Sequence, residues 1–277
     1  MTARDAVRAA AAQLERAGCP SPRVDAEWLV GHVLGMTRTG LYADGAREIA
    51  PPEEHRLREL VARRARREPL AYVLGEWGFR RLTLKVDPRV LVPRPETEVL
   101  VERCLDLLAD APEPRVLDVG VGSGAIALAI ADEHPAAHVV ATDSSSGALE
   151  LAAENRALAG LDDRVELVEG NLFAGLTGPF DLVVSNPPYV EPDELPSLQP
   201  EVRDFEPRAA LVASGVTEAL ARGTPDVLRP GGVLCLETAD GAASRVARLL
   251  ETLGYAQVTT NADVAGRERV VDGRTHR

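Results

Sequence analysis

Short apolar segments alternate with helical ones through the second half of the chain. Five of them read VLDVG, HVVATD, VELVEG, DLVVSN and GVLCLET, and they fall between residues 116 and 238. Residues 125–133 and 148–158, which lie between successive segments, have the apolar spacing of helices. Residues 255–260 and 269–271 are predicted to add two more strands. This alternation favours an α/β fold with a doubly wound, mostly parallel sheet.

The residues before this region have a different pattern. Apolar residues at helical spacing predict a helix near residues 7–17, a second one that Asp25 would cap, and a third that begins at Pro51. Alternation over residues 79–86, then an Asp-Pro turn at 87–88 and the apolar residues 90–92, predicts a β-hairpin. We therefore expect three parts, which are a helical domain over 1–75, a hairpin linker over 76–95 and an α/β domain over 96–277.

Charge and composition limit the function classes. The formal net charge is −12, which weighs against a main role in gripping duplex phosphates. The basic run RRARR at residues 63–67 is either a solvated helix end or a partner-binding patch. No apolar stretch approaches the ~20 residues that span a bilayer, and the start of the chain has no signal-peptide core. Three cysteines without metal spacing predict no metal site. We expect a cytoplasmic protein without a membrane or direct nucleic-acid partner.

A glycine-rich turn follows the first strand of the predicted sheet. The segment VLDVGVGSGA, residues 116–125, combines a strand, a tight turn and a helix start, where a ligand can approach the backbone closely. It fits the G-x-G-x-x-A form of the dinucleotide fingerprint, so the loop alone does not separate NAD from S-adenosylmethionine. Asp143, at the end of the next strand, could accept ribose hydroxyls in either case. Asp118 beside the turn favours the ammonium group of a methionine moiety over a pyrophosphate.

A second motif, Asn186-Pro187-Pro188-Tyr189, ends the fourth strand. Two prolines cannot continue a central strand, so the backbone here is stiff and its carbonyl groups are fixed. The Asn186 side-chain oxygen and the Pro187 carbonyl could accept both hydrogens of a planar –NH2 group, and Tyr189 offers a ring for stacking. Such a site would align a weak nitrogen nucleophile with a sulfonium methyl group without a strong base. We predict Asn186, Pro187 and Tyr189 as catalytic residues, with Pro188 beside them in the substrate site.

The pairing of these two motifs resembles amino-methyltransferases that act on adenine in DNA or on glutamine in proteins. Further segments narrow the resemblance, namely DAEWLVGHVLG, REPLAYVLGEWGF, VDPRVLVPRPETEVLVE and AGRERVV. Together they resemble, over nearly the whole chain and in the same order, the HemK/PrmC family of protein-(glutamine-N5) methyltransferases. Enzymes of this family modify peptide chain release factors.

The resemblance implies a Rossmann-like, seven-stranded class I methyltransferase domain behind a helical domain that recognises the release factor. The substrate would be the glutamine of the Gly-Gly-Gln motif, which acts in translation termination. S-adenosyl-L-methionine would be the methyl donor and S-adenosyl-L-homocysteine the product. The predicted cofactor residues are Asp118, Gly120, Val121, Gly122, Ser123, Gly124, Asp143, Asn171, Leu172 and Asn186.

Two segments depart from the family pattern. Asn171 stands where the family usually has an acid, and residues 237–240, ETAD, stand where Glu-x-Gly is common. The Asn171 oxygen can still accept from an exocyclic amine, so we expect retained binding with weaker charge assistance. Glu206-Pro207 matches the family, and we expect it to shape the rim of the cleft.

Other functions are left open by the motifs. An adenine-specific DNA methyltransferase would flip its base into the same pocket, but it predicts a basic DNA-facing domain. The sequence distinguishes only weakly between methylation of a glutamine in a ribosomal protein and methylation of one in a release factor, although the N-terminal domain is closer to the release-factor type. An NAD enzyme would leave the Asn186–Tyr189 motif without a role.

Overall fold

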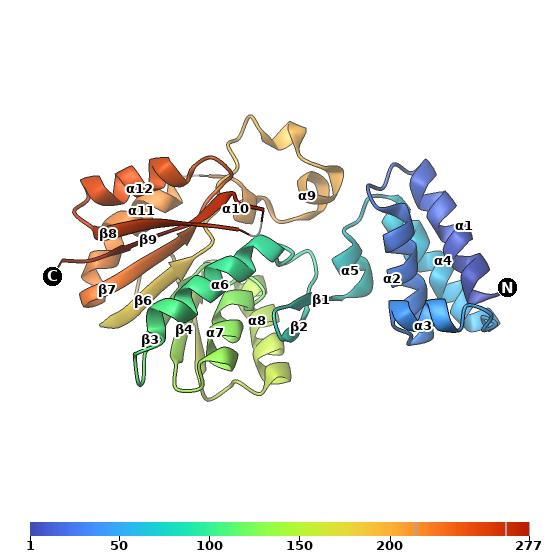
Figure 1. Cartoon of the computed structure of the whole chain (residues 1–277), viewed down its shortest axis with the longest axis horizontal. Helices are drawn as coiled ribbons and strands as arrows, with labels where there is room; N and C mark the ends of the chain where they lie inside the picture. The colour runs from blue at the N-terminus through green and yellow to red at the C-terminus, as the bar shows by residue number, and fades with distance from the viewer. Residues whose placement is uncertain (214, 264, 277) are drawn as a thin grey trace. The chain divides into compact units, whose positions relative to one another are not determined.

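The computed structural model describes residues 1–213, 215–263 and 265–276. The chain forms two compact units. The first combines Met1–Glu76 with Leu198–Phe205, and the second combines Trp77–Ser197 with the residues from Glu206 onward. The chain therefore passes from one unit to the other three times. Figure 1 follows this course by colour along the chain.

The first unit is helical. Its elements are α1 (Ala3–Arg16), α2 (Pro22–Leu34), α3 (Arg38–Ala43), α4 (Pro51–Ala65), α5 (Leu70–Leu74) and, from the later segment, α9 (Pro200–Phe205). Leu14, Leu29 and Leu60 are among the fully buried side chains of its core. The three predicted helices are present. The predicted cap is wrong, because α2 begins at Pro22, which is well suited to a first helical position, and Asp25 lies inside the first turn.

Asp25 belongs instead to a buried ion-pair cluster, which also contains Arg64, Arg67 and Glu201. The Arg64 guanidinium lies 2.7 Å from the Asp25 carboxylate and 2.8 Å from the Glu201 carboxylate. Arg67 donates two hydrogen bonds, of 2.7 and 2.6 Å, to Glu201. Arg64 is only 3% exposed. Arg63 pairs with Glu68. Because Arg64 is buried and ion-paired, it is neither part of a solvated helix end nor available to a partner, so both interpretations of the basic run are wrong for this residue.

The second unit contains a seven-stranded sheet with the strand order β5-β4-β3-β6-β7-β9-β8. Strands β3 to β7 pair in parallel, whereas β9 is antiparallel to β7 and to β8. All seven predicted strands are present. Their bounds are β3 (Arg115–Val119), β4 (His138–Asp143), β5 (Val165–Glu169), β6 (Phe180–Ser185), β7 (Leu228–Glu237), β8 (Ala256–Ala262) and β9 (Glu268–Arg274).

Helices cover both faces of this sheet, as Figure 1 shows. They are α6 (Pro95–Leu108), α7 (Ala125–Glu133), α8 (Ser146–Ala159), α11 (Val216–Gly223) and α12 (Ala243–Thr252), and the short helix α10 (Arg208–Leu211) belongs to the same unit. Val116 and Val184 pack with α6 and α7, whereas Leu117 and Val183 pack with α11 and α12. Because both faces are covered, the central strands read as continuous apolar runs rather than as alternating ones.

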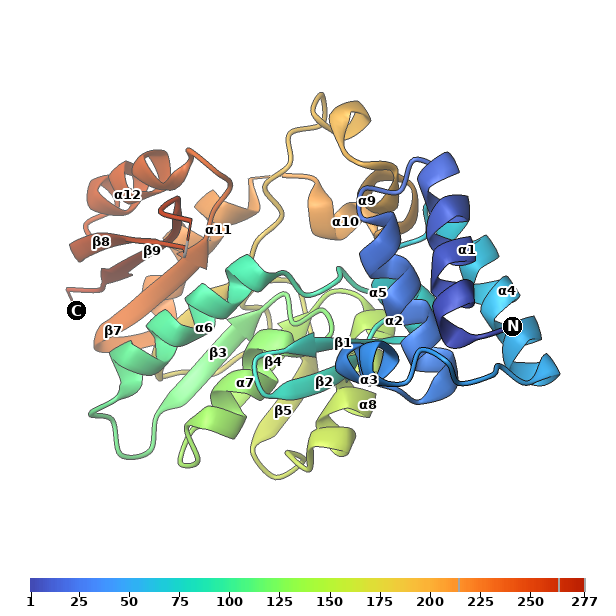
Figure 2. The same cartoon turned by 45° about the vertical axis from the view of Figure 1, so that its right-hand side comes forward.

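A hairpin is present, but not with the predicted strands and turn. It consists of β1 (Glu76–Phe79) and β2 (Leu82–Lys85), which turn at residues 80–81, and residues 90–92 belong to no strand. Phe79 and Leu84 are buried in the same core cluster as α6 and α7. The Asn155 side chain of α8 bonds both the backbone N–H and the carbonyl of Lys85, and Figure 2 shows β2 in front of the sheet near α8. The hairpin is thus part of the second unit's core. Within the described residues, no helix has the length and apolar character that crossing a membrane requires.

Candidate active site

A pocket of about 270 Å³ lies at the carboxyl ends of β3, β4, β5 and β6. This is the edge where open α/β sheets bind their ligands. Most of the predicted site residues line it, namely Gly120, Val121, Gly122, Ser123, Asp143, Asn171, Leu172, Asn186, Pro187 and Pro188. Three predicted residues do not line it, namely Asp118, Gly124 and Tyr189.

The glycine turn between β3 and α7 requires its glycines for two different reasons. Gly120 and Gly124 have φ values of 85° and 88°, which side-chain-bearing residues rarely adopt. A methyl group on Gly120 would meet no other atom within 4 Å, so this position keeps space free beside the loop. A methyl group on Gly124 would lie 2.9 Å from Leu128, so this position allows α7 to pack closely.

Asp143, at the end of β4, holds the glycine turn and faces the pocket. Its carboxylate accepts the Gly122 N–H at 3.0 Å through one oxygen and the Ser145 N–H at 2.9 Å through the other. Each carboxylate oxygen has a further lone pair. The side chain can therefore accept two more hydrogen bonds from a ligand without giving up its hold on the loop.

Asp118 lies beneath the turn and is completely buried. One oxygen accepts the Ala127 N–H at 3.1 Å, at the start of α7, and the other has no hydrogen-bond partner within the described residues. Burial raises the pKa of Asp118 to about 7. Its observed contact supports the helix start, and its predicted contact with an ammonium group finds no support in the pocket lining.

The Asn186–Tyr189 motif follows β6 directly. Ser185 is buried and donates to the Val119 carbonyl at 2.6 Å, which ties the end of β6 to β3. Asn186 donates through its side-chain nitrogen to the Thr97 hydroxyl at 3.2 Å. Pro187 is buried, and the Tyr189 side chain is partly buried, which raises the pKa of its phenol. The glycine turn and the Asn186 amide thus meet at one pocket.

Two features of the rim follow from other elements. Arg94 donates to both oxygens of the Glu206 carboxylate, at 2.7 and 2.6 Å, and Pro207 next to it lines the pocket. Leu172 has a φ of 54°, an uncommon value for a residue with a side chain. Backbone outliers of this kind often occur at binding sites.

Two buried polar residues behind Asn186 are not among the predicted site residues. Thr97 is 5% exposed and Glu237, the last residue of β7, is 2% exposed. The Thr97 hydroxyl accepts from Asn186 and lies beside the Glu237 carboxylate. The sequence contains them in the segments PETE and ETAD, but no spacing rule links either segment to Asn186, which is 89 residues from Thr97.

The seven-stranded sheet and the glycine turn at the end of β3 define a methyltransferase of the class I fold. A solved methyltransferase from Pyrococcus furiosus has this fold, with a TM-score of 0.50 and 21% identity over 70% of this chain and 88% of that one. Residues 5–75 match the family model "PrmC N-terminal domain", and residues 96–198 match "Methyltransferase small domain".

Two relatives narrow the class. The chain is 47% identical to a release factor glutamine methyltransferase of Deinococcus radiodurans, over 99% of each chain. It is 44% identical to one of Geobacter sulfurreducens, over 94% of this chain and 92% of the relative. The chain belongs to the release factor glutamine methyltransferase family.

Proposed function

We propose that this protein transfers a methyl group from S-adenosyl-L-methionine to the side-chain nitrogen of the glutamine in the Gly-Gly-Gln motif of peptide chain release factors. Family membership supports the reaction class. The observation that carries the proposal is the position of Asn186, whose amide lies at the same pocket as the glycine turn. An enzyme that binds a nucleotide for another purpose has no need of this amide between a strand end and two prolines.

The pocket fits the proposed methyl donor. Gly120 and Gly122 leave open space beside the turn, because a methyl group on either would meet no atom within 4 Å. Asp143 has acceptor capacity for the ribose hydroxyls, and Asn171 and Leu172 line the pocket where an adenine would lie. When bound, the donor supplies a methyl group on a positively charged sulfur atom.

The residues of the Asn186 motif would hold the substrate amide. The Asn186 side-chain oxygen and the Pro187 carbonyl accept its two hydrogens and so fix the direction of its nitrogen. That nitrogen is a weak nucleophile because its lone pair is delocalised over the amide. The two acceptors stabilise positive charge on the –NH2 group as it develops, and their positions are set before the substrate arrives. No strong base is needed, since the methylated nitrogen becomes acidic and loses a proton to water.

Asp143→Ala should weaken cofactor binding far more than it slows the saturated reaction. The variant loses the two proposed ribose contacts, and hydrogen bonds to a charged group contribute about 1.5–3 kcal/mol each. We expect Kd for S-adenosylhomocysteine, measured by calorimetry, to rise at least about tenfold. Because these contacts are equal in ground and transition states, kcat at saturating donor should change little. A collapse of kcat with unchanged Kd would show that Asp143 has another role.

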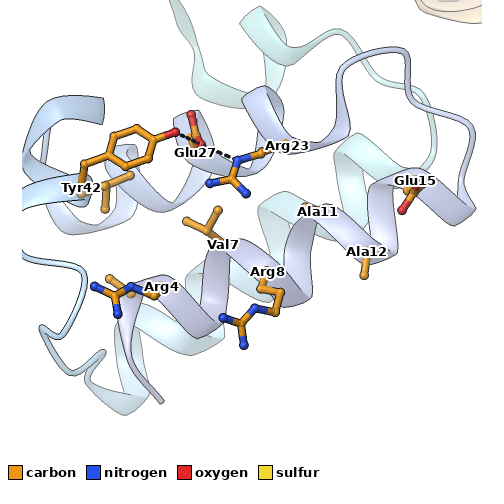
Figure 3. Close-up of a pocket in the computed structure, with 11 residues that line it drawn as sticks. Arg4, Val7, Arg8, Ala11, Ala12, Glu15, Arg23, Glu27 and Tyr42 are labelled. Atoms are coloured by element: carbon orange, nitrogen blue, oxygen red, sulfur yellow. Dashed lines mark hydrogen bonds and ion pairs between the residues drawn. The ribbon is translucent and has the colours of Figure 1, made fainter.

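The helical unit carries a surface that suits a protein partner. A groove of about 480 Å³ runs along α1, with Val7, Ala11 and Ala12 on its floor and wall (Figure 3). Across it, the buried carboxylate of Glu27 accepts from the Tyr42 hydroxyl at 2.6 Å and from Arg23 at 3.1 Å. These bonds hold the Tyr42 ring at the groove although it is 61% exposed.

The residues that line the groove carry a small excess of positive charge, with Arg4, Arg8 and Arg23 against Glu15 and Glu27. The charge of Glu27 is compensated by Arg23 and by Arg38, whose guanidinium lies 2.7 Å away. Arg8 forms a long ion pair with Asp5, at 3.7 Å, and the Arg4 guanidinium has no ion pair within the described part of the chain. We therefore assign this groove to the release factor, through a segment that presents apolar and acidic side chains.

Reversing the charges of Arg4 and Arg8 together, to Glu, should raise KM for intact release factor about tenfold. A short Gly-Gly-Gln peptide, which lacks the segment proposed to bind the groove, should have the same KM with the variant as with wild type. Added salt should shrink the difference between variant and wild type. The matched control is Arg245→Glu/Arg248→Glu on α12, which changes the net charge equally at two exposed arginines of the other unit. Equal KM values for the two double variants would exclude the groove.

Mass spectrometry tests the function itself. Incubation of release factor with the protein and S-adenosylmethionine should add one methyl group to the glutamine of Gly-Gly-Gln. Methylation of a ribosomal protein or of DNA instead, in parallel incubations, would overturn the proposal.

A further inference from the structure

Three polar side chains from three different elements lie next to one another at the pocket and form a row of hydrogen-bonding groups. Asn186 follows β6, Thr97 lies in the first turn of α6, and Glu237 ends β7. The Asn186 nitrogen lies 3.2 Å from the Thr97 hydroxyl oxygen, and the Glu237 carboxylate lies beside that hydroxyl, which can donate to it. One carboxylate oxygen of Glu237 has no hydrogen-bond partner within the described residues. Only Asn186 of the three is not fully buried.

The chemistry of these three groups decides which of them donates and which accepts each hydrogen bond. An ionised carboxylate only accepts hydrogen bonds, so the single hydrogen of the Thr97 hydroxyl must point at Glu237. Thr97 can then only accept from Asn186, which it does from the –NH2 half of the amide. The amide oxygen of Asn186 is thereby left for the pocket. An asparagine without this support could turn its –NH2 group to the substrate amide, where two donors would face each other.

We propose that Thr97 and Glu237 are positioning residues, which fix the orientation of the Asn186 amide so that its oxygen accepts from the substrate. This inference rests on the proposed function. It adds that the Glu237 carboxylate, acting through Thr97, determines that the oxygen of the Asn186 amide faces the substrate. Each would act through the Asn186 amide, although Thr97 also lines the pocket.

The direction of these hydrogen bonds depends on the charge of Glu237. The charged and titratable groups around it are Glu96 and Arg94 near the start of α6, Arg269 of β9 and the phenol of Tyr189. Burial raises the pKa of Glu237 to about 7, and Glu96 adds to this, whereas the Thr97 hydrogen bond and the two arginines oppose it. Arg269 is shared with Asp240 and Asp263, at 3.8 and 3.7 Å.

Protonation of Glu237 would reverse the direction of these hydrogen bonds. A neutral carboxyl can donate to Thr97, which frees the Thr97 hydrogen for the Asn186 oxygen and turns the –NH2 group toward the pocket. Turnover should therefore be high above about pH 7 and should fall as the pH decreases through that value. The substrate amide does not titrate in this range, so it contributes no such limb.

The first test compares variants at Thr97. Thr97→Val removes the hydroxyl at nearly constant volume and should lower kcat about 10- to 100-fold, since misorientation of a reacting group has effects of this size. Kd for S-adenosylhomocysteine should not change. Thr97→Ser keeps the hydroxyl and should retain most of the turnover. The control is Thr224→Val, which removes an equally buried hydroxyl that bonds the Leu220 carbonyl away from the pocket.

The second test is the pH dependence of kcat with intact release factor. Wild type should show an acid limb near pH 7. Glu237→Gln carries no charge at any pH, so it should lose this limb and stay below the wild-type plateau at high pH. Thr97→Val matching Thr224→Val in kcat, or an acid limb that survives in Glu237→Gln, would overturn the inference. Failure of wild type to methylate release factor would instead overturn the proposed function.

Discussion

Asn186→Ala is expected to abolish methyl transfer while the protein remains folded. The variant loses a fixed acceptor at the point where positive charge develops on the substrate amide. The loss of one such preorganised group costs about 2.7–4 kcal/mol, or roughly 10²–10³ in kcat. Single-turnover rates with intact release factor, together with the circular dichroism spectrum, measure both parts of this expectation.

Two further variants sharpen the result. Asn186→Asp should be nearly as damaging, because a carboxylate cannot donate to Thr97 and would lie close to the charge of Glu237. Asn261→Ala is the control, since its side chain bonds Asp272 in the distant part of the sheet. Turnover of Asn186→Ala above about a tenth of the wild-type rate would contradict the assigned role.

Glu201→Ala should strongly destabilise the helical unit. The variant leaves Arg64, which is 3% exposed, with Asp25 as its one carboxylate partner beside the Glu68 carbonyl, and it removes both bonds between Arg67 and Glu201. Removing one member of a buried ion pair costs about 3–5 kcal/mol. Because Asp25 still compensates Arg64, we expect a loss of about 3 kcal/mol in the free energy of unfolding, measured in urea.

An exposed ion pair provides the matched comparison for this variant. Glu218 pairs with Arg222 on α11, and both side chains are more than half exposed. Glu218→Ala should change the free energy of unfolding by at most about 1 kcal/mol, as is usual for surface pairs. Similar effects of Glu201→Ala and Glu218→Ala would show that the buried cluster contributes little to stability.

The sheet could be predicted in detail because its strands are buried on both faces. Such strands read as short apolar runs, and glycine turns or helices separate them, as in residues 116–125. The basic run at 63–67 could not be interpreted from sequence alone. Basic residues at a helix end normally face solvent, and nothing near them in the chain points to Glu201, which is 134 residues from Arg67.

The same distinction holds for the candidate site. Asn186 and Asp143 were predictable because each lies at the carboxyl end of a strand, and the carboxyl ends of parallel strands meet at one edge of the sheet. Thr97 reaches this edge from the first turn of a helix, and Glu237 reaches it from a strand that a sheet neighbour separates from β3. Asp118 shows the limit of adjacency, because the strand's alternation turns its side chain beneath the loop.

The three passages of the chain between the two units bear on how substrate choice can change in evolution and in the laboratory. The segment Leu198–Phe205 completes the helical unit. The chain enters this unit shortly after the Asn186 motif and returns to the second unit at Glu206. A chimera that joins residues 1–76 of one relative to the remainder of another would therefore bring together arginines and a Glu201 counterpart of different ancestry. With partner selection by the helical unit, as we propose, a new specificity would need two matched pieces of sequence, and the Asn186 motif lies between them.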